Sequence, residues 1–441
     1  MEQKTTNFQV IILIVFSSFI LLGVIIFSTS KLKQGTSTTT TPVIMWGTLS
    51  SDAMAKFVEV ITANDKNSLQ MTYVQKDAKT FEKDLIEAIA DGAGPDIAVI
   101  SEDMVLKNVN KFTTIPFATY PIRNFKDQFI DASSVYLKSD GVLAIPFIVD
   151  PMVMYWNKTH FVNANIVNPP KDWNDFSKVV LKLTKKDSNF NVTQSGVALG
   201  EYQNILHSKD ILSMLFIQAG AQIVTKNPDD SYRSSLYFNS GSADNTAGTV
   251  ALSFYTDFAN PSKDLYSWNK SLKSSFDSFI SGDTSIYFGF ASELASIPFK
   301  NPNLNFDVSG VPQATGANKK SVFAKIYGLA ILKSSKNQNS ALTQIITMTS
   351  KSSIADLSVI TNLPPVRKDV LVNNSSDPYM QIFYDSALIS DTWPDPNPAS
   401  TELVFKKMIE SVISGRSNTD TAVSVADGEV RNVILENSKI K

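Results

Sequence analysis

Polar and aromatic side chains directly follow two apolar, strand-like segments near the start of the globular sequence. Trp46 and Thr48 stand at the end of one segment, and Glu102 and Asp103 follow the run from Asp96 to Ile100. In parallel α/β sheets, ligands bind outside the carboxyl ends of the strands. We therefore expect these four side chains to line a ligand site. Each of them, taken alone, also fits an ordinary turn.

The composition argues against catalytic and metal chemistry. The chain has no cysteine and only two histidines, His160 and His207, too few for the usual catalytic triads and His-rich zinc sites. We interpret both histidines as ordinary surface or loop residues. No carboxylate pair is identified by its spacing, and no phosphate-binding loop is found. The sequence therefore predicts a binding protein with no enzymatic activity, no metal and no cofactor.

The charge distribution argues against a polyanionic partner. The formal net charge is only -2, and the lysines and arginines are scattered along the chain. Proteins that bind nucleic acid gather such residues into a basic patch. We therefore expect no nucleic-acid partner.

The apolar pattern predicts the elements that position the candidate site. Strand-like and helical patterns alternate along residues 43–46, 54–61, 69–74, 81–89 and 96–100. This β-α-β-α-β order is typical of a mainly parallel sheet covered by helices on both faces. With 441 residues the chain exceeds the usual size of one hydrophobic core, so we expect two lobes.

The N-terminal segment predicts a membrane anchor. Val10 to Phe27 is apolar except for two serines and a glycine, which is long enough for a helix that crosses a bilayer. We expect a tail at 1–9, an anchor at 10–30 and a flexible stalk at 31–42. A cleaved signal peptide is the alternative, because small residues follow the apolar run. By the positive-inside rule, Lys31 and Lys33 favour a cytoplasmic position for the domain that follows the anchor. We still expect this domain outside the cell, because large domains translocate largely regardless of charge.

Several segments carry a family resemblance through their order and spacing. They are Gly94 to Ile97, Ile145 to Asp150 with Tyr155 to Lys158, Pro169 to Trp173, Phe279 to Ile286, and Ile326 to Ile331. From Val43 onward the chain resembles extracellular solute-binding family 1, the sugar-binding proteins of ABC transporters. This group includes maltose-, multiple-sugar- and glycerol-phosphate-binding proteins.

The resemblance implies an α/β, two-lobed periplasmic-binding-protein type II fold with a hinge and an interlobe cleft. In this chain the cleft-bearing part would follow the N-terminal transmembrane helix. The implied first lobe covers 43–147 and 287–333, and the second covers 148–286 and 334–441. The cleft would hold the ligand and close around it.

The implied function is the extracytoplasmic capture of a carbohydrate for the permease subunits of an ABC importer, by a monomer held at the cell membrane. A protein of the same fold for a peptide or another small solute, or a sensor ectodomain, is the nearer alternative. An exported glycan hydrolase is a more distant one. The family's lipid-attachment cysteine is absent, and no tryptophan follows Thr284 as in maltose-binding relatives, so the sugar stays open.

The resemblance also implies further ligand-binding residues. Trp393, in a proline-rich loop, would offer a flat face to a sugar ring, and Trp46 would offer a second face or pack in the core. Asp150 would reach a ligand hydroxyl from the hinge, or else cap a turn before Pro151. Tyr287 is a further candidate for the same site.

Overall fold

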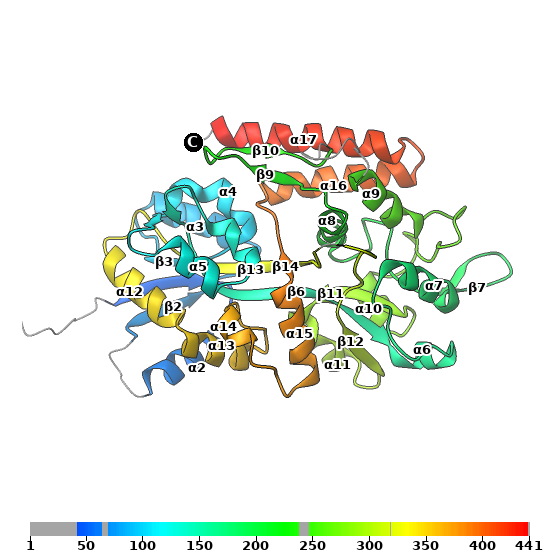
Figure 1. Cartoon of the computed structure of the whole chain (residues 1–441), viewed down its shortest axis with the longest axis horizontal. Helices are drawn as coiled ribbons and strands as arrows, with labels where there is room; N and C mark the ends of the chain where they lie inside the picture. Colours follow the sequence, from blue (N-terminus) through cyan, green and yellow to red (C-terminus); the bar gives the residue numbers. More distant parts are fainter. Residues whose placement is uncertain (1–41, 64–68, 238–246, 318, 440–441) are drawn as a thin grey trace, which may run out of the picture. The chain divides into compact units, whose positions relative to one another are not determined.

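The computed structural model describes residues 42–63, 69–237, 247–317 and 319–439, and their centre is one large sheet (Figure 1). Its eight strands include a path in the order β11-β6-β13-β3-β1-β2, while β12 pairs with β6 and β14 with β13. The strands are β1 (Val43–Gly47), β2 (Met71–Gln75), β3 (Ile97–Ser101), β6 (Ile145–Asn157), β11 (Ile286–Phe290), β12 (Phe306–Ser309), β13 (Val322–Ile331) and β14 (Ser390–Asp391).

The N-terminal β-α-β-α-β unit predicted from the sequence is confirmed. Strands β1, β2 and β3 are parallel, and helices α2 (Ser51–Thr62) and α3 (Phe81–Ala90) connect them. Helix α2 begins directly after Ser50, because the Ser50 side chain accepts a hydrogen bond from the amide of Ala53. The carboxyl ends of β1 and β3 therefore lie at the same edge of the sheet.

Strand β6 connects the two halves of the sheet. Its first half pairs with β13, its second half pairs with β11 and β12, and all its thirteen residues are buried. Alternate side chains of its second half enter different cores: Val153 and Tyr155 belong to one, Met152 and Met154 to the other. The two cores therefore share this strand.

The first core packs on β1, β3, the start of β6 and β13. Helices α12 (Gln338–Met348), α13 (Lys351–Thr361) and α15 (Pro378–Leu388) contribute Ile345, Leu357 and Phe383 to it. The apolar faces of these helices contact α2, β13 and β6. The expected division of the chain, with residues 334–441 in the second lobe, stays a prediction.

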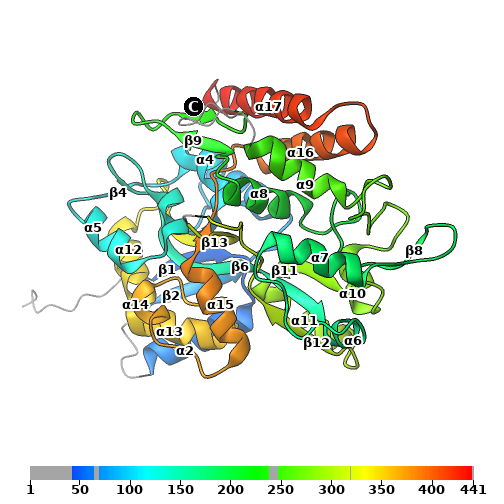
Figure 2. The same ribbon diagram turned by 45° about the vertical axis from the view of Figure 1, so that its right-hand side comes forward.

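The second core contains helices α7 (Trp173–Leu183), α8 (Ser208–Gln218), α9 (Ala247–Asp257), α16 (Pro398–Ile413) and α17 (Thr419–Lys439). The hairpin of β9 (Val224–Lys226) and β10 (Tyr232–Ser234) packs against α17. Helices α16 and α17 lie side by side in both views (Figures 1 and 2). The connection from β14 to α16 carries the predicted Trp393 loop into this core.

Shorter elements complete the described chain. They are α4 (Val105–Asn108), β4 (Ile115–Pro116), α5 (Ile122–Gln128), β5 (Gly141–Val142), α6 (Lys158–Asn163), β7 (Lys185–Lys186), β8 (Val192–Gln194), α10 (Ser275–Ile280), α11 (Ser296–Lys300) and α14 (Lys368–Leu371). Within the described residues, none of the helices has the length and apolarity needed to cross a membrane. The predicted tail 1–9, anchor 10–30 and nearly all of the stalk lie outside the described residues.

Candidate ligand site between the two cores

A cavity of about 180 Å³ lies where the two cores meet. It is bounded by the end of β3, the start of α8, the start of β13 and the loop that leads into α16. Its lining combines charged and aromatic side chains: Glu102, Asp103, Lys209, Asp210, Phe323, Lys325, Trp393, Asp395, Pro398 and Glu402. Glu102, Asp103 and Trp393 were expected at the site, and the structure brings these three together.

The two lysines of the cavity are held by carboxylates. Lys209 forms an ion pair with Asp395 and donates a hydrogen bond to Thr401 at 2.9 Å, and Lys325 lies 3.6 Å from Asp210. Burial alone would lower the pKa of both ammonium groups, but the neighbouring carboxylates raise each pKa above its usual value. Both lysines are therefore charged at neutral pH and already paired.

The two carboxyl groups after β3 have a different environment. The side chain of Glu102 is buried and accepts a hydrogen bond from the amide of Ile326 at 2.9 Å, while Asp103 accepts one from the Ser101 hydroxyl. Burial, and then the charge of Asp103, raise the pKa of Glu102 to about 8. Burial also raises the pKa of Asp103. At neutral pH Glu102 is mostly protonated, so it can both donate and accept hydrogen bonds.

Trp393 forms an aromatic wall of the cavity. Its indole is 5% exposed, stacks on Phe405 with ring centroids 6.1 Å apart, and donates a hydrogen bond to the Ser213 hydroxyl at 3.1 Å. The ammonium of Lys209 lies 5.4 Å from its ring centroid. The ring is thus fixed by the second core while it borders the cavity.

Asp150 and Tyr287 lie beside the cavity without lining it. Asp150 pairs in register with Lys325 and accepts a hydrogen bond from the amide of Ser292 at 3.0 Å, and burial raises its pKa to about 6. Tyr287 is buried and donates to Glu293 at 2.7 Å. Asp150, on β6, and Tyr287, on β11, therefore bond to the segment after β11, at Ser292 and Glu293.

His207 lies in the turn before α8, as a loop residue, but it is also part of this network. Its side chain is 15% exposed and lies 2.6 Å from Glu293 and 3.6 Å from Asp210. Burial lowers its pKa, but these two carboxylates outweigh burial and raise the pKa overall. A chain of polar contacts therefore runs from Tyr287 through Glu293 and His207 to Asp210 in the cavity wall.

Trp46 and Thr48 lie at the same edge of the sheet as Glu102 but apart from the cavity. Trp46 is partly buried against the first core, and the ammonium of Lys76 lies 3.7 Å from its ring centroid. Within the described residues, neither Trp46 nor Thr48 belongs to the cavity lining. In this arrangement Trp46 packs on the core and offers one face to Lys76.

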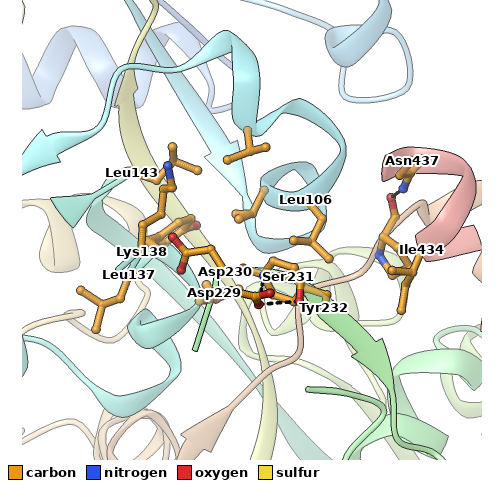
Figure 3. A pocket seen from close by; sticks show the side chains of 15 residues that line it. Leu106, Leu137, Lys138, Leu143, Asp229, Asp230, Ser231, Tyr232, Ile434 and Asn437 are labelled. Carbon is orange, nitrogen blue, oxygen red and sulfur yellow. Dashed lines mark hydrogen bonds between the residues drawn. The ribbon is translucent and has the colours of Figure 1, made fainter. Parts of the chain in front are cut away.

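A second cavity of about 350 Å³ also lies between the cores, and Figure 3 shows it. Its walls are mainly apolar and include Leu106, Leu143 and Ile434. At its rim the β9–β10 turn reaches the loop after residue 136. Asp230 accepts a hydrogen bond from the amide of Ser139 at 3.0 Å, and Lys226 donates to the carbonyl of Leu137 at 2.8 Å.

Sequence reasoning missed Lys209, Asp210, Lys325 and Asp395. One signal was available, because Lys325 is the single charged residue in the apolar run of β13. Lys209 and Asp210 look like an ordinary first turn of a helix. Among the described residues, no cluster of histidine and acidic side chains is suited to hold a metal ion.

Comparison with known proteins agrees with this architecture. A protein-family model described as bacterial extracellular solute-binding protein matches residues 53–381. No curated protein sequence matches the chain.

Solved structures show the same fold at low sequence identity. One is a cyclic alpha-maltosyl-1,6-maltose binding protein from Arthrobacter globiformis, with a TM-score of 0.73, 17% identity, and coverage of 89% of this chain and 99% of that one. The sugar-binding protein MalE from Xanthomonas citri has a TM-score of 0.70, 16% identity, and coverage of 91% and 99%. An ABC substrate-binding protein from Listeria monocytogenes, in complex with cycloalternan, has a TM-score of 0.65, 14% identity, and coverage of 89% and 98%.

The family model spans most of both cores, and the solved structures are covered almost completely. The chain therefore belongs to the family of bacterial extracellular solute-binding proteins.

Proposed function

We propose that this chain is the extracytoplasmic solute-binding component of an ABC importer and that it captures a carbohydrate in the charged cavity between its lobes. The observation that carries the proposal is the convergence of distant segments on one cavity. Glu102 and Asp103 come from the first core, while Lys209, Trp393 and Asp395 come from the second. The neighbours named for maltose-type sugars and cycloalternan support the class of ligand.

The chemistry of the cavity suits a sugar. A sugar ring presents hydroxyl groups around its rim and C–H groups on its faces. Carboxylates accept hydrogen bonds from hydroxyls, ammonium groups donate to them, and an indole packs against C–H groups. The cavity lining holds all three kinds of group.

We further propose that binding closes two lobes around the ligand. The first lobe would comprise 43–147 and 287–333 together with the helices at 338–388, and the second would comprise 148–286 and the chain from 389 onward. Strands β6 and β13 pass between them and would act as the hinge, because both carry residues of both cores. The domain would bind and release its ligand without chemical change.

The N-terminal segment would hold this domain outside the cell. We propose that residues 10–30 form an uncleaved anchor and that the domain delivers its ligand to permease subunits in the same membrane. Intact cells should retain the protein in the membrane fraction, with the C-terminal part open to external protease. A soluble mature form that begins near Lys31 would instead establish a cleaved signal peptide.

A ligand screen tests the binding function. The unit from residue 42 to the C-terminus is titrated with mono- and oligosaccharides, amino acids, peptides and phosphate esters, and the unfolding temperature is measured. A ligand raises that temperature by mass action. We expect a saccharide to do so and to be recovered unchanged. Stabilisation by a peptide alone, or turnover of a glycan that one carboxylate mutation abolishes, would refute the proposal.

Two variants test whether the ligand binds in the charged cavity. Asp103→Asn replaces a carboxyl group of the lining with an amide, and Asp385→Asn makes the same change on the exposed part of α15. We expect only the first to weaken saccharide binding.

A further inference from the structure

The hairpin of β7 and β8 projects away from the other elements in both views (Figures 1 and 2). Its turn carries Phe190, whose side chain is 77% exposed. Leu181, near the end of the preceding helix α7, is 47% exposed. The hairpin and the helix before it therefore each present one exposed apolar side chain that neither core contains.

The turn itself does not require a phenylalanine at this position. Phe190 has a φ of +63°, in the left-handed region that glycine and asparagine adopt most easily. Asp187 holds the turn, because its carboxylate accepts hydrogen bonds from the amides of Asn189 and Asn191 at 2.8 and 2.9 Å. The backbone amide of Phe190 donates to the carbonyl of Asp187 at 3.0 Å. A bulky ring at a left-handed position costs folding free energy and gains no buried contact in return.

The surroundings of Phe190 are basic. From 182 to 194 the chain has three lysines, Lys182, Lys185 and Lys186, and a single acid, Asp187, whereas the whole chain has a net charge of -2. All three lysines are exposed, and within the described residues none of them forms an ion pair, while the ammonium of Lys186 lies 5.0 Å from the Tyr266 ring centroid. Both oxygens of Asp187 are occupied by the turn, through Asn189 and the amide and side chain of Asn191.

We propose that this hairpin is a contact site for an anionic lipid bilayer, with Phe190 entering the interfacial region and the three lysines facing the headgroups. An exposed aromatic ring gains free energy when it enters that region. Basic residues next to it are attracted to anionic headgroups. An apolar tip that follows three lysines in the chain is complementary in both respects to such a surface. The predicted N-terminal anchor would hold the domain within reach of the bilayer, but the inference rests on the hairpin and not on the ligand site.

A single fluorescent label tests the contact directly. The chain has no cysteine, so Ser188→Cys gives one labelling site in the exposed turn, and Asn374→Cys gives a control site in the exposed loop before α15. The full chain is labelled with the fluorophore NBD and placed in detergent, in neutral phosphatidylcholine nanodiscs, and in nanodiscs that contain phosphatidylglycerol. Emission wavelength and quenching by iodide are then measured.

We expect the label at 188 to shift to shorter wavelength and to be protected from iodide in the anionic nanodiscs, while the label at 374 stays unchanged. Replacing one lysine with glutamine should weaken the contact by about fivefold, and high salt should act in the same direction. Equal quenching in detergent and in both kinds of nanodisc would overturn the proposal. Protection in detergent that rises with protein concentration would also overturn it, because it would indicate self-association.

A further variant distinguishes a role of Phe190 in membrane contact from a role in stabilising the fold. Phe190→Gly relieves the left-handed strain, so the unfolding temperature should stay the same or rise, while the protection of the label at 188 is lost. A fall in unfolding temperature with protection retained would mean that Phe190 serves the fold and not the membrane.

Discussion

The two cavities between the cores differ in whether direct hydrogen bonds join the two cores beside them. Around the ligand cavity, charged groups from the two cores face each other, and Asp103 and Glu102 form no direct hydrogen bond to Lys209 or Asp395 in the described structure. At the second cavity the cores are joined directly, through the bonds of Asp230 and Lys226 to residues 137–139. The ligand cavity therefore leaves hydrogen-bonding groups of Glu102 and Asp103 for a ligand. At the second cavity, the hydrogen bonds of Asp230 and Lys226 are made within the protein.

Asp395→Ala should give the largest change, because it breaks the buried pair of the ligand cavity. Asp395 and the Lys209 side chain are 4% and 12% exposed, so the variant removes the nearest carboxylate from a buried ammonium and leaves it the longer pair with Glu402, at 3.9 Å. We expect a loss of about 3–5 kcal/mol in the free energy of unfolding, measured by urea denaturation at neutral pH. Glu429→Ala, which breaks an exposed pair with Lys407, should cost about 1 kcal/mol or less. Equal losses in the two variants would contradict the assignment.

Trp393→Ala tests the aromatic wall of the same cavity. It removes a buried ring, so stability should fall by about 3–5 kcal/mol, and saccharide affinity should fall by about 1–3 kcal/mol. Trp173→Ala is the matched control in the second core, where Trp173 packs on Phe176, Phe254 and Phe288. That variant should lower stability and leave the affinity, measured by calorimetry below the unfolding temperature, unchanged. Loss of affinity in both variants would point to a general effect of unfolding.

Glu102 should make stability depend on pH. Its folded pKa of about 8 exceeds its ordinary value of 4.5, so between these values the folded protein binds more protons at this group than the unfolded chain. The contribution of Glu102 to stability is therefore fully present below pH 4.5 and is lost as the pH rises through about 8. Glu102→Gln should flatten the fall in stability over this range, as measured by denaturation at several pH values. An unchanged pH profile would show that Glu102 is ionised in the folded protein.

Asp230→Ala should have the smallest effect on stability, because Asp230 is only half-buried. We expect a loss of about 1 kcal/mol from its hydrogen bonds to Ser139. Because those bonds hold the present arrangement of the cores, closure of the ligand cavity should become easier, and saccharide affinity should rise. Asp229→Ala is the control, since among the described residues the side chain of Asp229 bonds only within its own turn, to Ser231. Lower affinity in Asp230→Ala would mean that the β9–β10 turn supports the ligand-bound arrangement.

The contrast between these regions also explains what the sequence could predict. The order of strands and helices at 43–101 and the ends of β1 and β3 followed from local apolar patterns, and so did the place of Glu102 and Asp103. The helices at 338–388 show that an apolar face predicts burial without indicating which core it packs against. His207 and Asp210 could not be placed, because their environment depends on Glu293 and Lys325, which are distant in the sequence. Trp46 also ends an apolar strand, yet it is partly buried against the first core and contacts Lys76, which the pairing of β1 with β2 brings close.

Hydrogen exchange with and without the best saccharide of the screen tests most directly which cavity holds the ligand. We expect the ligand to slow amide exchange at residues 101–104, 207–211 and 325–327, which surround the charged cavity. Residues 135–139 and 229–232, at the second cavity, should exchange at an equal or higher rate once the ligand is bound. Protection confined to the second cavity would contradict this account.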